Sequence, residues 1–180
     1  MNWYTAIVHD YPFTSAMVQF AILGTLGDCI ARWLRARRFV VPFPPKEFIW
    51  KFIEWAFLAI LIKVAFVGFA GFVDTLLDYD ILPAVFETGF LNAFAISVTM
   101  NLQFGILLVL LHRILDGLPF GKINWANISG GLYSLLWFWI PAHTVTFMLP
   151  QQYRIGLAAL WSVMLGLILG WFNKVDTTSR

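Results

Sequence analysis

Long apolar stretches with few charges recur along this chain of 180 residues, and they constrain its fold more than any other feature. A helix that crosses a membrane needs roughly 20 mostly apolar residues. The sequence therefore predicts an all-α, polytopic transmembrane helical bundle of about five helices, with four as the alternative, in a single domain over residues 1–180. The five stretches run over about 13–34, 48–73, 83–115, 131–149 and 151–171.

The composition leads to the same expectation. Hydrophobic residues make up 60% of the chain and charged residues only 12%, whereas a soluble domain has about 45–50% apolar and about 25% charged residues. A small water-soluble domain could not bury so much apolar surface, so the predicted environment is the lipid bilayer. The formal net charge of +2 is too small to indicate a nucleic-acid partner.

Prolines, glycines and acidic residues separate the predicted helices. The run 42–45 separates the first helix from the second, residues 78–83 separate the second from the third, and residues 117–121 follow the third. Pro150 alone divides the fourth segment from the fifth. Those two segments are therefore either a tight hairpin or one bent element.

The distribution of Lys and Arg predicts the orientation, because cytoplasmic loops carry an excess of positive charge. The first connection is strongly basic and the second has no Lys or Arg. With five spans, the N-terminus is predicted outside and the C-terminus inside. The first twelve residues resemble neither a secretory signal nor a transit peptide. A mitochondrial inner, a peroxisomal and a bacterial inner membrane therefore all stay open.

Lys63 lies in the middle of the second apolar stretch, about 16 Å past Phe52 along the helix. A charge at that depth is costly and is expected to face a partner or a water-filled cavity. Asn101, Gln103 and His143 are predicted at similar depth, which suggests a polar layer across the bundle. For each residue the alternative is an interhelical hydrogen bond of about 0.6–2 kcal/mol.

Asp28 and Arg32 share a helix face at the inner end of the first stretch, because they are four residues apart. They could form an interfacial salt bridge or packing contact, or shape the end of a solute pathway. Gly27, beside Asp28, would let another helix approach closely. Pro141 interrupts the fourth stretch and removes a helix hydrogen bond. Either it lines a cavity, or Thr144 and Thr146 satisfy nearby backbone groups.

Small residues recur every four positions on the last predicted helix and form one face, including a Gly-x-x-x-Gly pair. This face is either an internal packing seam or a contact with a second copy or with subunits of a membrane complex. Its members are Ala158, Ser162, Gly166 and Gly170.

Enzyme motifs are missing from the sequence: it has no Gly-rich phosphate loop and no credible Ser/His/Asp set. Cys29 is the only cysteine, so neither an intrachain disulfide nor a cysteine-rich zinc site is expected. His9, His112 and His143 are predicted at different depths, which argues against a three-histidine metal site. The chain is therefore expected not to be an enzyme, and neither a cofactor nor a metal is predicted.

The order of several motifs resembles the Mpv/PMP family of small peroxisomal and mitochondrial inner-membrane proteins, and the similarity spans nearly the whole chain. Arg32 and Ile140 depart from that family's Gln and from the Trp of its Trp-Pro. The matching motifs are Tyr4 and Pro12 before the first helix, Gly27-Asp28, Asn124-Trp125, the run Trp137–Pro141, Phe147, and Pro150, Tyr153 and Arg154 in a Pro-x-x-Tyr-Arg pattern.

The resemblance implies a weakly selective channel or pore for small solutes with a role in membrane homeostasis, and it transfers no catalytic residue. In that interpretation Lys63 and His143 line the pathway, while Asp28, Arg32 and Arg154 shape its ends. The alternative is a non-transporting structural or assembly subunit of a membrane complex. A membrane-embedded enzyme acting on lipid is a third idea, supported only by the scattered polar residues.

Overall fold

The computed structural model describes residues 2–39, 43–123, 125 and 128–172, and all regular structure in these residues is helical. This confirms the all-α prediction for the described part of the chain. Two of the short elements, η2 and η4, are π-helical, and η1 and η3 are 3-10 turns. The elements are α1 (Trp3–Asp10), α2 (Pro12–Ala36), α3 (Pro45–Asp78), η1 (Ala84–Phe86), α4 (Gly89–Met100), η2 (Asn101–Gly105), α5 (Ile106–Gly117), η3 (Leu118–Phe120), α6 (Ile128–Ser134), η4 (Leu135–Trp139), α7 (Ile140–Met148) and α8 (Gln151–Phe172).

Prolines set the beginnings of the first two long helices. Pro12 and Pro45 occupy the first turns of α2 and α3, where the missing N–H would have no partner inside the helix. Helix α2 ends at Arg37, whose φ of 54° is left-handed and stops further helical hydrogen bonding. The predicted boundary at the proline-rich connection is confirmed where the structure describes it; residues 40–42 lie outside that part.

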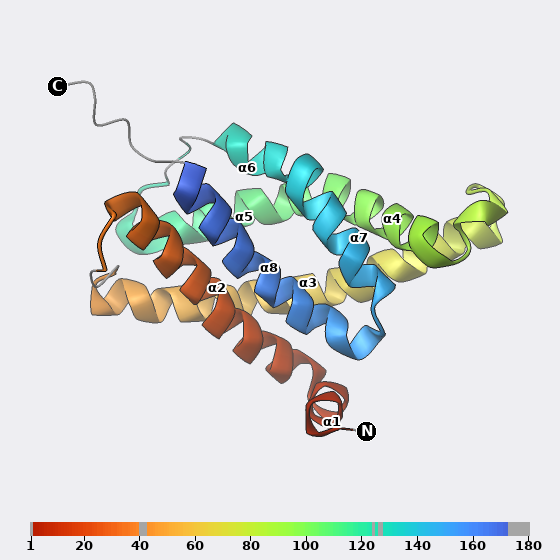
Figure 1. The fold of residues 1–180 in the computed structure, drawn as a ribbon, viewed down its shortest axis with the longest axis horizontal. Helices are drawn as coiled ribbons and strands as arrows, with labels where there is room; N and C mark the ends of the chain where they lie inside the picture. The colour runs from red at the N-terminus through yellow and green to blue at the C-terminus, as the bar shows by residue number, and fades with distance from the viewer. Residues whose placement is uncertain (1, 40–42, 124, 126–127, 173–180) are drawn as a thin grey trace.

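Helix α3 is longer than a bilayer requires. Its 34 residues span about 51 Å at 1.5 Å per residue, whereas the hydrocarbon core of a bilayer is about 30 Å thick. In Figure 1 the end of α3 and the beginning of α4 project together beyond the other helices. Exposed Tyr79 and Ile81 lie in this projecting turn, and Gly89, with φ +66°, begins α4.

The third long helix contains a π-helical turn at its centre. Helices α4, η2 and α5 continue into one another, so residues 89–120 form a single helical stretch. The second π-helical turn, η4, packs against η2, since a Cβ added to Gly105 would lie 2.9 Å from the Leu135 side chain. π-helical turns are rare and often occur at functional sites. The contact between η2 and η4 therefore makes this level of the bundle a candidate for a functional site.

Pro141 lies at the beginning of α7, directly after the π-helical turn η4. Thr144 Oγ1 donates to the Ile140 carbonyl over 2.7 Å, and Thr146 Oγ1 donates to the Ala142 carbonyl over 2.9 Å. The two threonines therefore satisfy backbone groups near the proline, as the local alternative predicts.

The helices pack as a bundle in which α2 lies against both α3 and α8, while α7 lies against α4 (Figure 1). Helices α7 and α8 reverse direction at residues 149–150 and contact each other. They form a hairpin and are not one bent element. The turns after α2 and α5 lie at the same end of the bundle as the end of α8, and α1 lies toward the other end.

Three helical stretches are long and apolar enough to cross a membrane: α2, α3 and residues 89–120. The fourth and fifth predicted segments do form helices, α6–η4–α7 and α8. In the described residues, neither reaches the same combination of length and hydropathy. The prediction of about five spans is therefore not confirmed, and the structure supports three.

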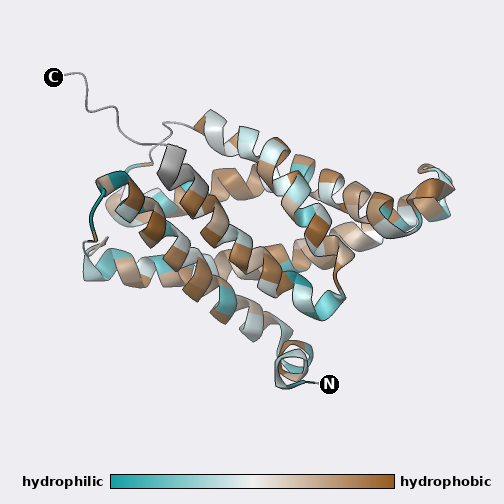
Figure 2. Cartoon of the chain, viewed as in Figure 1, coloured by the Kyte–Doolittle hydropathy of each residue, from teal (hydrophilic) through white to brown (hydrophobic). Residues whose placement is uncertain are grey.

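The packed interior is built from small and aromatic side chains, with Ala16 and Phe20 of α2 packed with Ala59 of α3 and Ala158 of α8. Large apolar side chains are also exposed on the long helices, whose ribbons are mostly coloured hydrophobic in Figure 2. A soluble monomer rarely exposes contiguous apolar surface on this scale, and lipid is the solvent that accommodates it. Examples of such outward residues are Val18, Ile22, Val64, Val67 and Leu107.

Candidate functional site

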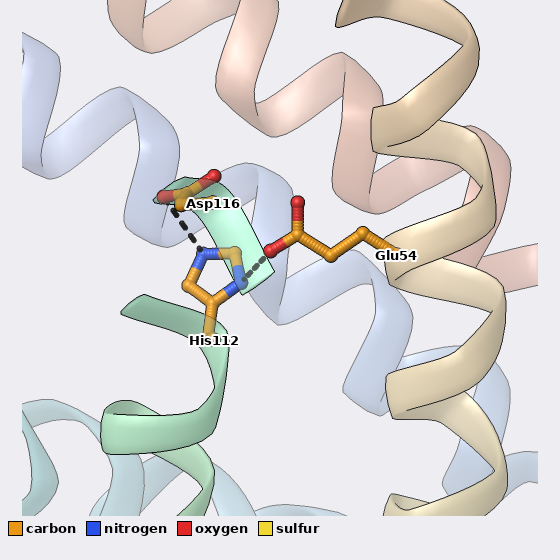
Figure 3. A group of neighbouring side chains, drawn as sticks. All are labelled: Glu54, His112 and Asp116. Carbon is orange, nitrogen blue, oxygen red and sulfur yellow. Dashed lines mark ion pairs between the residues drawn. The ribbon is translucent and has the colours of Figure 1, made fainter. Parts of the chain in front are cut away.

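Five ionisable side chains from three helices meet near one end of the bundle, and we call them the charged cluster. Asp28 comes from α2, Lys51 and Glu54 come from α3, and His112 and Asp116 come from α5. The spacings place each pair on one helix face, since Lys51 and Glu54 are three residues apart and His112 and Asp116 four. Figure 3 shows Glu54, His112 and Asp116 pointing toward one another.

Lys51 is the central cation of the charged cluster. Its Nζ lies 3.3 Å from Asp28 Oδ2 and 3.2 Å from Glu54 Oε2, and it also contacts Asp116 Oδ1. Its side chain is only 7% exposed. One ammonium group therefore joins carboxylates from α2, α3 and α5.

Glu54 is the most deeply buried member, with a side chain that is 0% exposed. Its Oε1 lies 2.7 Å from Nδ1 of His112, and Nε2 of His112 lies 4.0 Å from Asp116 Oδ2 (Figure 3). Glu54 Oε2 is in turn 3.2 Å from Lys51 Nζ, so both oxygens of this buried carboxylate are compensated by ion pairs within the cluster.

Two tryptophans of α3 border the charged cluster. Trp55 Nε1 donates to Asp28 Oδ2 over 3.0 Å, and the Trp55 ring lies 4.9 Å from the His112 ring. Trp50 Nε1 donates to the Leu115 carbonyl over 2.9 Å. Gly24 of α2 lies beside the Trp55 ring, and a Cβ at Gly24 would collide with that ring. The aromatic rings therefore fix α2, α3 and α5 around the charges.

The charges within the cluster do not balance. Three carboxylates surround one lysine, and His112 adds positive charge only when it is protonated. Unbalanced charge in a poorly solvated site is costly. The cluster itself could therefore hold an additional cation, either a proton or a metal ion.

Asn101 and His143, two members of the predicted polar layer, do come together. Both are buried, and Asn101 Nδ2 lies 3.1 Å from His143 Nδ1 while donating to the Ser97 carbonyl over 2.8 Å. Ser97 Oγ donates to the Ile140 carbonyl over 2.7 Å. These bonds tie α4 and η2 to α7 at the level of the π-helical turns.

The other two members of the predicted layer lie elsewhere. Gln103 is exposed, so it points away from the Asn101–His143 pair. Lys63 is half-buried, and the charged residue that acts on it is Arg154 of α8, which is also positive. Of the predicted layer, the structure therefore brings together only Asn101 and His143.

The Pro-x-x-Tyr-Arg segment forms the turn between α7 and α8. The Pro150 carbonyl accepts the backbone N–H of Tyr153 over 3.0 Å, and Arg154 Nε donates to the Leu149 carbonyl over 2.9 Å. The Tyr153 ring stacks on the Tyr4 ring of α1 at 5.9 Å. In the structure these residues shape the turn of the hairpin and attach α1 to it.

The small-residue face of α8 packs against α2. A Cβ on Gly27 would lie 2.7 Å from the Ser162 carbonyl oxygen, and one on Gly166 would lie 2.8 Å from the Gly27 carbonyl carbon. The described part of this face is therefore an internal packing seam. The surroundings of Gly170 lie outside the described part of the structure.

Arg32 lies beside the charged cluster and forms an ion pair with Glu47 of α3, with 2.6 Å between Nη2 and Oε1. Its guanidinium also stacks over the Phe43 ring at 4.0 Å. Asp28 and Arg32 both form interhelical contacts with α3, which agrees with the packing alternative for these two residues.

Sequence reasoning missed most of the charged cluster. It singles out Asp28 and considers His112 only as one of three histidines, and it assigns no role to Lys51, Glu54 or Asp116. A signal was present in the Lys51/Glu54 and His112/Asp116 spacings, which place each pair on one face. What the spacing could not supply is the pairing of those faces, because Lys51 and Asp116 are 65 residues apart.

No protein-family model matches the chain, and no curated protein and no solved structure matches it either. The resemblance to the Mpv/PMP family therefore stays a prediction. The class of protein follows from the structure: three helices long and apolar enough to cross a membrane, with exposed large apolar side chains, indicate a helical membrane protein.

Proposed function

We propose that this membrane protein is a weakly selective channel for small solutes, with the charged cluster at one end of its path. The proposal rests on the burial of Glu54 and Lys51. They lie among Asp28, His112 and Asp116, and all five residues come from three helices that are long and apolar enough to cross a membrane. Ionisable groups inside membrane helices are costly and most often mark ion or solute pathways.

Polar groups recur at several levels along the bundle, which supports a path. Along α3, Lys63 follows Lys51 by twelve residues, a rise of about 18 Å. Along the third long helix, Asn101 precedes His112 by eleven residues, a rise of about 16 Å. The charged cluster would be one polar level of the path, and the Asn101–His143 pair would be a second level about 16 Å further along the bundle. The resemblance to the Mpv/PMP family agrees with this proposal.

The test is flux through the purified protein in liposomes or planar bilayers. We expect conductance or solute flux above that of empty membranes, with small cations favoured over anions because carboxylates outnumber lysine in the cluster. Asp116→Asn should lower the preference for cations, since it removes one of the three negative charges.

The matched control is Asp78→Asn at the end of α3, outside the charged cluster, which should leave the cation preference unchanged. Absence of flux above empty membranes across pH and voltage would remove the channel proposal. An equal change of selectivity in both variants would remove the cluster from the path.

A second candidate is a structural or assembly subunit that transports nothing. The observation in its favour is that Lys51 and His112 contact the carboxylates of the charged cluster directly, so the cluster can serve as a clamp between α2, α3 and α5. This candidate predicts no flux and defined partners in crosslinking of native membranes, whereas the channel predicts flux from the purified chain alone.

A further inference from the structure

We propose that Glu54, His112 and Asp116 form a binding site for a divalent transition-metal ion such as Zn²⁺ or Mn²⁺. Each residue can offer one ligand atom, and the three atoms lie within 4.8 Å of one another. This site goes beyond the proposed channel and does not depend on it, because an ion can bind whether or not solutes cross the bundle.

The buried carboxylate of Glu54 points to a ligand. Its side chain is 0% exposed, and its oxygens are held by ion pairs without a directed hydrogen bond: Oε1 lies 2.7 Å from His112 Nδ1 and Oε2 lies 3.2 Å from Lys51 Nζ. Buried polar atoms are almost always hydrogen-bonded, so each exception requires an explanation. A metal ion would satisfy the Glu54 oxygens and a ring nitrogen of His112 together.

His112 directs Nδ1 at Glu54 and Nε2 at Asp116 (Figure 3), so a shared ion requires side-chain rotation that brings both carboxylates to one ring nitrogen. Metal–ligand bonds to His nitrogen and carboxylate oxygen are about 2.0–2.2 Å long, so two ligands on one ion are at most about 4.4 Å apart. Nε2 of His112 lies 4.0 Å from Asp116 Oδ2, too far for a hydrogen bond but within that limit. Their side chains are 30% and 31% exposed, which leaves an approach for the ion.

Charge favours a cation at this position. Asp28, Glu54 and Asp116 bring three negative charges and Lys51 brings one positive charge, so two negative charges remain when His112 is neutral. A divalent ion balances those two charges. Arg113 acts on Asp116 as a further, smaller positive influence from α5.

The donor atoms select the class of metal. One imidazole nitrogen and two carboxylate oxygens suit Zn²⁺, Mn²⁺ and Fe²⁺, whereas Ca²⁺ and Mg²⁺ prefer oxygen ligands alone. None of the three proposed ligands is a thiol, since Cys29, the chain's only cysteine, is not among them. A site for soft ions such as Cu⁺ is therefore not expected.

The experiment uses the full chain, purified in detergent and stripped of metal with a chelator. Co²⁺ serves as the spectroscopic probe and Zn²⁺ as its competitor. We expect one Co²⁺ per chain, visible as ligand-field absorption and displaced by Zn²⁺. His112→Gln and Asp116→Asn should each weaken binding by about tenfold or more, since each removes a proposed ligand.

Two matched controls separate this site from surface binding. His9→Gln removes an exposed histidine that contacts Asp10, and Glu47→Gln removes a carboxylate that pairs with Arg32 on the same helix as Glu54. Both should bind Co²⁺ as the unaltered protein does, whereas Glu54→Gln should not. Equal losses of Co²⁺ affinity in His9→Gln and His112→Gln would overturn the proposal.

The variant Lys51→Met tests the site through an expected gain, and not a loss, of Co²⁺ affinity. Its ammonium contacts two of the proposed ligands, Glu54 and Asp116, so it competes with the ion for their oxygens. Replacing it should tighten Co²⁺ binding by about tenfold or more, and bound metal should restore the thermal stability that the variant loses. Failure of the unaltered chain to bind a stoichiometric ion would show that the cluster is held together by its own charges. Unchanged Co²⁺ affinity in Lys51→Met would show that the ion binds away from Glu54 and Asp116 and would also overturn the proposal.

Discussion

The ammonium of Lys51 contacts carboxylates from α2, α3 and α5, which makes it the residue that joins the three helices of spanning character. A buried ion pair contributes little net stability when complete, but removing one partner leaves uncompensated charge. In the charged cluster that imbalance would be large, because Asp28, Glu54 and Asp116 would all lose the ammonium that contacts them. The cluster therefore depends on Lys51 for its stability.

We predict that Lys51→Met destabilises the metal-free protein by about 3–5 kcal/mol, the usual cost of breaking a buried pair on one side. The measurement is thermal unfolding in detergent with chelator present. The control is Lys63→Met on the same helix, because Lys63 is half-buried and its charged neighbour is the cation Arg154. Equal losses of thermal stability in Lys51→Met and Lys63→Met would contradict the central role of Lys51.

Helices α2 and α8 approach each other backbone to backbone, and the reason is the absence of side chains at Gly27 and Gly166. Between membrane helices, association depends on packing and on hydrogen bonds, because lipid tails are as apolar as the side chains they would replace. Small residues therefore decide which faces can meet. The same face could in principle have served a second copy, but the described part of it is already covered.

We predict that Gly166→Ala destabilises the protein by about 1–3 kcal/mol, the range for overpacking a well-filled interior. The added methyl group would meet the Gly27 backbone, which cannot move aside as a flexible side chain can. Gly68→Ala is the control, since a Cβ there has nothing within 4 Å, and alanine favours the helix by about 0.5–1 kcal/mol. Thermal unfolding of both variants measures the difference, and a neutral Gly166→Ala would show that the seam is loose.

At the scale of the whole molecule, the bundle has two distinct ends. The charged cluster lies toward the end that carries the turns after α2 and α5, and the long projecting turn after α3 lies at the opposite end. The turn after α2 holds the basic residues Arg35, Arg37 and Arg38, so the positive-inside rule assigns this end to the cytoplasm or its equivalent. This orientation is a prediction. The side on which the α7–α8 turn lies would show whether that hairpin crosses the membrane.

We predict that single cysteines at the two ends react with a membrane-impermeant reagent from opposite sides. In a Cys29→Ser background, Arg37→Cys and Gly121→Cys should be labelled from the inner side, and Tyr79→Cys from the outer side. Leu149→Cys in the α7–α8 turn should behave like Tyr79→Cys if this hairpin spans the bilayer. Labelling of Leu149→Cys from the inner side would restrict the protein to the three spans that its helices support.

Much of the fold could be predicted because the signals are local. Apolar runs of spanning length predict helices, and Pro12, Pro45 and Pro150 mark boundaries that the structure shares. The polar layer was only partly predictable, because depth along a helix can be read from the sequence but rotation cannot. Asn101 and Gln103 lie two residues apart at nearly the same depth, yet one faces His143 and the other is exposed.

By itself the sequence determined the solvent and the secondary structure of this protein: a chain so apolar must form helices in lipid, where each helix satisfies its own backbone hydrogen bonds. Only the tertiary structure decided which charges share a site. Glu54 and His112 meet because α3 and α5 pack side by side beside α2, and their contact at 2.7 Å depends on the rotation of each helix about its axis. That rotation is set by packing among all the helices at once, so no local pattern specifies it.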